Sequence, residues 1–171
     1  HPPGRPLGCP YKWGDFPWSG VITQRQGGGG ARGGPAGGRV FRGHFRHTTD
    51  PKGRLSIPAR FREALDGDLG DKLVVVPIDH ALEVYPLSAW RDIEAKVAAL
   101  PKFDEDARKF KYAYLSRAQD VSLDAQGRIQ LSSDYRERAG LDKDVIVIGM
   151  LDHFEVCDPD RYAHVGDPRG A

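Results

Sequence analysis

Cysteine is scarce in this 171-residue chain: Cys9 and Cys157 stand near opposite ends, without a Cys-x-x-Cys or Cys/His spacing. The sequence therefore predicts neither a disulfide framework nor a zinc site. We expect Cys157 to be a small buried apolar residue. Long apolar runs are also missing, because no stretch reaches the roughly 18–20 residues that cross a bilayer or resembles a secretory signal. We predict a cytoplasmic protein without a membrane partner.

Methionine occurs once, as Met150, so no initiator methionine stands near the start. Residues 1–39 are rich in glycine and proline, lack apolar periodicity and are predicted to be disordered. This leader carries five basic residues and one acidic residue, a net charge of +4. Because the net charge of the whole chain is +1, the remainder has a net charge of −3. We interpret it as translated upstream sequence or an artificial extension, with Val40 as the favoured true start.

The residue combinations of an enzyme are missing as well. His44 and His47 fall on opposite faces of a predicted strand, and the glycine run at 27–30 lacks the Lys-Ser/Thr of a phosphate loop. The pairs Asp79–His80 and Asp152–His153 occupy equivalent turns of a repeat, without a serine or cysteine nucleophile beside them. We expect no catalytic residue, no metal, no cofactor and no small-molecule substrate.

What the chain does contain is an internal duplication. The pattern Asp-x-x-Gly-Arg-apolar-x-apolar covers residues 50–57 and recurs at 124–131. Further matches follow in the same order, and they pair 58–62 with 132–136, 74–76 with 145–147, and 79–84 with 152–156. A duplicated unit of this kind predicts a fold that is built twice.

Each copy of the pattern has the chemistry of a tight hairpin turn. Asp50 can accept hydrogen bonds from the following backbone amides, and Gly53 tolerates the positive φ that returns the chain to a strand. Asp124 and Gly127 hold the same places in the second copy. We predict two equivalent hairpins whose turns are shaped by these four residues.

The arginine after each turn is the residue we select as functional. Arg54 and Arg128 would project from rigid hairpins, where the planar guanidinium can meet phosphate or the O6 and N7 atoms of guanine. The alternative is that the pattern is only turn chemistry and each arginine bonds its own aspartate or a carbonyl. Other basic side chains near the first hairpin could contact phosphates or be solvated surface, namely Lys52, Arg42, Arg46, Arg60 and Arg62.

The remaining patterns indicate an α+β fold. Short helices are predicted at 58–65 and 132–140, and strands at 73–78, 81–85, 145–150 and 154–157. Two amphipathic helices connect the repeats, one capped by Ser88 and reaching Leu100, the other running from about Asp104 to Ala118. A terminal helical turn is expected around 160–164.

The segments Val40–Arg62, Asp124–Arg128 and Gly149–Val156 strongly resemble the MraZ family of bacterial transcriptional regulators. The resemblance covers Val40 to about His164. It implies two SpoVT-AbrB-type swapped-hairpin domains, with β-barrel-type halves paired as a pseudo-dimer within one chain, and a ring-like homo-oligomer. It also implies a nucleoid-associated protein that binds double-stranded promoter DNA and represses the division and cell-wall gene cluster, including its own promoter.

The resemblance also implies domain limits and site residues. The two domains would cover 44–87 and 118–161, joined by connecting helices at 88–117. The DNA-contacting face would include Asp50 with Arg54 and Asp124 with Arg128. Two alternatives stay open: an antitoxin-like swapped-hairpin protein, which would also bind a toxin, and an oligomeric scaffold, which would need neither arginine.

Overall fold

The computed structural model describes residues 40–65 and 70–166, so the predicted leader at 1–39 lies outside the described residues. Its eight strands are β1 His44–Thr48, β2 Arg54–Ser56, β3 Lys72–Ile78, β4 Ala81–Pro86, β5 Gln119–Ser122, β6 Arg128–Gln130, β7 Asp144–Gly149 and β8 Phe154–Cys157. The helices are α2 Ala59–Ala64, α3 Leu87–Ala98, α4 Glu105–Ala113, α5 Ser133–Arg138 and α6 Pro159–Gly166, with a 3₁₀ turn at Leu115–Arg117. None of these helices is long and apolar enough to span a membrane.

The strands form two antiparallel sheets. Six of them make one sheet in the order β1-β7-β8-β4-β3-β5, and β2 pairs with β6 in a second, two-stranded sheet. The first strand of each repeat pairs with a strand of the other repeat, because β1 joins β7 and β5 joins β3. This exchange confirms the predicted α+β fold of two swapped-hairpin halves within one chain.

A pseudo-twofold relation follows from the register of the central pairs. Leu55 lies opposite Ile129 in the small sheet, and Glu83 lies opposite Glu155 where β4 meets β8 in the large sheet. Strand residues alternate between faces, so Leu55 and Ile129 both point into the core and are fully buried. The same core holds Phe61 of α2 and the inward-facing residues of the large sheet.

The connecting helices differ in detail from the prediction. Ser88 was expected to cap the first, but α3 begins at Leu87, and Pro86 precedes it without a side-chain cap. That prediction is wrong because Pro86, whose ring fixes φ at a value suited to entering a helix, takes the N-cap place two residues earlier. Asp104 caps α4 by accepting a hydrogen bond from the amide of Asp106.

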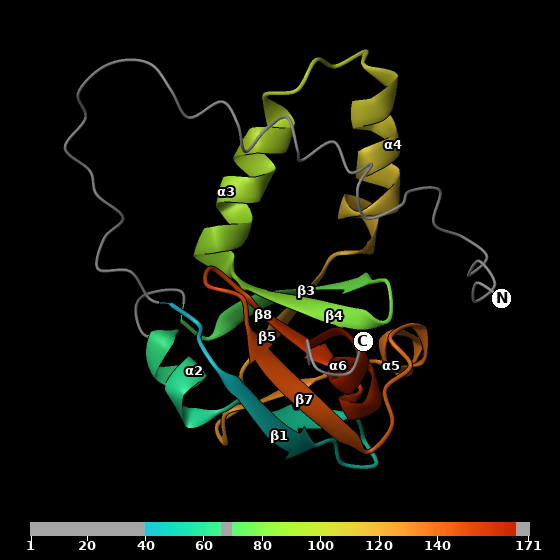
Figure 1. The fold of residues 1–171 in the computed structure, drawn as a ribbon. Coiled ribbons are helices and arrows are strands. Elements are labelled where there is room, and N and C mark those ends of the chain that lie inside the picture. Colours follow the sequence, from blue (N-terminus) through green and yellow to red (C-terminus); the bar gives the residue numbers. More distant parts are fainter. Residues whose placement is uncertain (1–39, 66–69, 167–171) are drawn as a thin grey trace, which may run out of the picture. The chain divides into compact units, whose positions relative to one another are not determined.

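The second connecting helix is also shorter than predicted. It ends at Ala113, and the chain continues as the 3₁₀ turn instead of reaching Ala118 in one helix. Tyr114 stands at this break, and its hydroxyl donates a hydrogen bond to Glu83 of β4. As Figure 1 shows, α3 and α4 form a helical hairpin that stands at the β3–β4 side of the large sheet.

Candidate nucleic-acid interface

The small sheet places both predicted arginines on one face. Arg54 lies opposite Gln130, and Arg128 lies opposite Ser56. Since Leu55 and the residue opposite it point inward, these four residues point to the other face, toward solvent. Arg54 and Arg128 are diagonal neighbours in this register, which separates their Cα atoms by about 7–8 Å.

The first turn is built by Asp50. One carboxylate oxygen, Oδ1, accepts hydrogen bonds from the amides of Lys52 at 3.0 Å and Arg54 at 2.9 Å. Gly53 has a φ of +81° and donates its amide to the carbonyl of Asp50 at 2.9 Å. The side chain of Gln130 on β6 donates to the carbonyl of Lys52, which ties the turn to the small sheet.

The second turn repeats this geometry. Asp124 Oδ1 accepts from the amides of Gln126 and Arg128, both at 2.9 Å. Gly127 has a φ of +73° and donates its amide to the carbonyl of Asp124 at 3.0 Å. The side chain of Gln126 adds one contact that the first turn does not have, since it accepts from Arg128 Nη2 at 3.3 Å.

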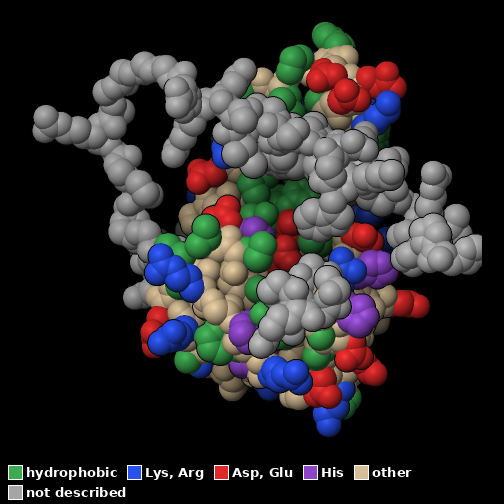
Figure 2. Space-filling view, in the orientation of Figure 1, with side chains coloured by type: hydrophobic (Ala, Val, Ile, Leu, Met, Phe, Trp, Pro, Cys, Tyr) green, Lys and Arg blue, Asp and Glu red, His purple; other side chains and the backbone are tan. Residues whose placement is uncertain are grey.

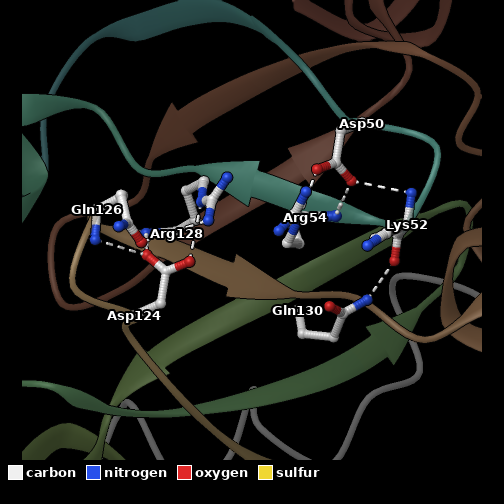
Figure 3. A network of polar contacts seen from close by, with 7 residues as sticks. All are labelled: Asp50, Lys52, Arg54, Asp124, Gln126, Arg128 and Gln130. Carbon is white, nitrogen blue, oxygen red and sulfur yellow. Dashed lines mark hydrogen bonds and ion pairs between the residues drawn. The ribbon is translucent and has the colours of Figure 1, made fainter.

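Each arginine is bonded to its own aspartate, as the alternative reading anticipated. Arg54 Nε lies 2.5 Å from Asp50 Oδ2, and Arg128 Nε lies 2.9 Å from Asp124 Oδ2 (Figure 3). The pairing occupies only the Nε edge of each guanidinium. Within the described residues, the terminal nitrogens of Arg54 have no partner. The aspartates therefore orient the arginines and leave donors for a ligand.

The chain matches the family model described as "MraZ protein, putative antitoxin-like" over residues 40–113 and again over 114–166. The chain belongs to the MraZ family. A transcriptional regulator MraZ from Desulfitobacterium hafniense is 44% identical over 126 residues, which cover 73% of this chain and 85% of that protein. One from Limosilactobacillus fermentum is 38% identical over 128 residues, or 75% of this chain and 87% of the relative.

Two further arginines lie at the turns of this MraZ family member. A Cβ atom added to Gly53 would lie 2.9 Å from Nε of Arg136, which belongs to α5. One added to Gly127 would lie 2.7 Å from Nη1 of Arg62, on α2. Each turn thus receives an arginine from the other repeat. Sequence reasoning named Arg62 but missed Arg136, although the duplication aligns the two positions.

The other predicted basic residues are less closely tied to the turns. Lys52 is exposed at the tip of the first turn. Arg42 precedes β1 and Arg60 lies on α2, and both are exposed. In the described residues, no hydrogen bond or ion pair joins the side chains of Arg42 or Arg60 to either turn. The compact cluster consists of Arg54 and Arg128, which are bonded within the turns, and of Arg62 and Arg136, which lie against the turn glycines.

The two turn aspartates should make the stability of the fold depend on pH in the acidic range. The backbone amide of Arg54 is the main cause that holds the pKa of Asp50 below its ordinary value, and that of Arg128 acts likewise on Asp124. A lowered folded-state pKa adds stability above about pH 4 that is lost as pH falls further. We therefore expect the D50N/D124N variant to lose less stability than the wild type between about pH 4 and pH 2, measured by urea unfolding.

The control for this experiment is D134N, because Asp134 pairs with Arg138 on α5 rather than at a turn. Its pH slope separates the effect of removing an ion-paired carboxylate from the effect of removing the two turn acceptors. Equal pH slopes for the wild type and D50N/D124N would contradict the assignment of these carboxylates as turn acceptors that remain ionised in the folded state.

Proposed function

We propose that this chain is a transcriptional regulator that binds double-stranded promoter DNA with the exposed face of the β2–β6 sheet and its two turns. The observation that carries the proposal is the pair of aspartate-oriented arginines, Arg54 and Arg128, on that one face. The major groove of B-DNA admits a two-stranded β-ribbon. A Cα separation of about 7–8 Å corresponds to roughly two base-pair steps, so both arginines can enter one groove.

The residues around the ribbon divide into three roles in this proposal. Arg54 and Arg128 read guanine edges or adjoining phosphates through their free donors. Asp50, Gly53, Asp124 and Gly127 hold the turns in shape. Phosphate contacts that fix the position on DNA come from Lys52, Arg42, Arg60, Arg62 and Arg136. This arrangement of oriented cations needs no cofactor, and we propose no enzymatic role.

Oligomerisation is part of the proposal because bulk charge does not favour DNA binding. Residues 40–171 carry a net charge of −3. A ring of identical chains would present many copies of the basic face to repeated DNA boxes, and tethered contacts add through effective concentration. We propose that such a ring acts in the cytoplasm on the nucleoid, and that the two swapped-hairpin domains, 44–87 and 118–161, contribute one hairpin each to every subunit's face.

The proposed target is the promoter of the division and cell-wall gene cluster, including the gene's own promoter. Its support is the membership in the MraZ family and the name transcriptional regulator that the relatives carry. For the target itself, we rely on the family resemblance of the hairpin motifs. Repression through repeated upstream boxes is the mode of action we propose.

The test is binding of the full chain to the DNA upstream of its own gene across a salt series. We expect nanomolar to micromolar binding that weakens linearly in log–log form as salt rises, because phosphate contacts release counterions. DNA of equal length and unrelated sequence is the control. An intact oligomer that binds neither DNA, or both equally at every salt concentration, would overturn the regulator proposal and favour a scaffold.

A further inference from the structure

A polar cluster lies on the large sheet, on the face turned away from the core. Glu83 and Glu155 are direct partners where β4 meets β8, and both point to that face because the neighbours Leu82 and Val84 point into the core. His153 lies beside them in the turn before β8. The Glu155 and His153 side chains are only 18% and 12% exposed. In Figure 2, acidic and histidine side chains lie together among hydrophobic ones below the helical hairpin.

Two facing carboxylates need a cation. Like charges directly opposite each other on neighbouring strands are destabilising. Burial raises the pKa of Glu83, against the effect of the hydrogen bond from Tyr114. Among the described residues, no lysine or arginine forms an ion pair with Glu83 or Glu155. The basic side chain beside this pair is His153, whose Nε2 atom faces Glu155.

The ring of His153 is held in the orientation typical of a metal ligand. Its Nδ1 atom lies 2.6 Å from Asp152 Oδ1, and the ring stacks on Tyr85 with centroids 4.3 Å apart. Its Nε2 atom is buried without a hydrogen-bond partner among the described residues, 3.9 Å from Glu155 Oε1. In metal sites, a carboxylate on one ring nitrogen commonly fixes the tautomer that directs the other nitrogen at the ion.

We propose that Glu83, His153 and Glu155 form a binding site for a divalent transition-metal ion, with Zn²⁺ as the best match. Their ligand atoms all lie within 4.8 Å of one another. A tetrahedral ion about 2.0–2.2 Å from each atom would hold them roughly 3.5 Å apart, which needs only small side-chain rotations. One imidazole and two carboxylates suit zinc, whereas calcium and magnesium prefer ligand sets made only of oxygen.

The surrounding residues already support such a site. Tyr114 donates its hydroxyl to Glu83, Asp152 holds His153, and Tyr85 covers the imidazole ring. Tyr114 belongs to the break after α4 and packs against Trp90 of α3. An ion at this cluster therefore links the sheet to the helical hairpin through Glu83.

The duplication provides a matched control. His80 is the repeat equivalent of His153, but its side chain is 51% exposed and its Nε2 atom lies 3.4 Å from Asp79. The two glutamates are equivalent to each other across the pseudo-twofold axis, so a single histidine distinguishes the two sides of the cluster. The site is thus specific to the half that faces the helical hairpin.

The experiment is calorimetric titration of the full chain with Zn²⁺, with Mg²⁺ in parallel. We expect one Zn²⁺ per chain and no comparable Mg²⁺ binding. H153A should weaken this binding by about 100-fold or more, D152N by about 10–100-fold, and H80A should leave it unchanged. The pink to blue absorption of bound Co²⁺ should likewise be lost in H153A and kept in H80A.

Two outcomes would overturn the proposal. One is a wild-type chain that binds no Zn²⁺, in which case the histidine's proton alone balances the glutamate pair. The other is equal loss of binding in H153A and H80A, which would mean adventitious surface binding only. If H153A does not fold, E155Q keeps the side-chain shape and tests the same ligand set, with circular dichroism as the check on folding.

Discussion

Substitution of both hairpin arginines, R54A/R128A, is expected to reduce affinity for the upstream DNA by about 100-fold or more. Loss of one arginine that contacts a base or phosphate costs about 1–3 kcal/mol, and the two contacts lie on one face of the ribbon. Each single variant should therefore weaken binding by roughly 10-fold to 100-fold. In an oligomer that engages several DNA boxes, the loss is repeated at each engaged subunit. Fluorescence anisotropy at fixed salt measures the effect.

Two controls separate contact from charge. R108A removes one positive charge from the exposed side of α4, and we expect its affinity to stay within about two-fold of the wild type. R54K keeps the charge but loses the planar fork and the Nε bond to Asp50, so it should behave nearly like R54A. Normal DNA binding by R54A/R128A, with unchanged oligomer size, would show that the hairpins do not contact DNA.

The substitution G53A, which adds one methyl group, is expected to cause a large loss of stability. A Cβ atom at this position would lie 2.4 Å from the backbone carbonyl oxygen of Leu131, and the φ of +81° is already unfavourable for any residue other than glycine. Left-handed strain costs roughly 1–2 kcal/mol and the forced backbone shift adds about as much again. We expect the free energy of unfolding to fall by about 2–4 kcal/mol in urea titrations at one fixed protein concentration.

Gly140 supplies the comparison for this variant. Its φ is +64°, but an added Cβ atom would meet nothing within 4 Å. G140A should therefore lower the free energy of unfolding only by the backbone strain, about 1–2 kcal/mol. G127A should fall between the two, because its Cβ atom would meet the flexible side chain of Arg62 rather than backbone. Equal losses for G53A and G140A would contradict the close contact of the first turn with Leu131.

Local chemistry made much of this structure predictable. The turn residues Asp50 and Gly53 act within a few positions of each other, so their hydrogen bonds could be expected from the sequence and reappear in the second copy. Ser132 likewise acts locally, because its hydroxyl accepts the amide of Tyr135 at 3.3 Å and caps a short helix. The duplication predicted a fold that is built twice, and the family resemblance supplied the swapped-hairpin arrangement of the two units.

Nonlocal contacts were not predictable in the same way. The packing of Arg136 over Gly53 joins two repeats, and nothing near either residue in the sequence indicates it. The two Asp-His pairs look alike in sequence, yet His153 is buried beside Glu83 while His80 is half exposed. The difference arises from the helical hairpin, which covers only one of the two equivalent turns.

The exchange of strands between the repeats also affects how the protein is made. Strand β1 pairs with β7, and the pairing partner of Thr48 is Asp144, which is synthesised 96 residues later. At a synthesis rate of about 5–20 residues per second, the edge of β1 stays without its partner for roughly 5–20 s on the ribosome. During translation, the unpaired edge of β1 is therefore open to pairing with strands of other chains. Chains that are synthesised on the same messenger RNA can pair with it before the second repeat of its own chain emerges.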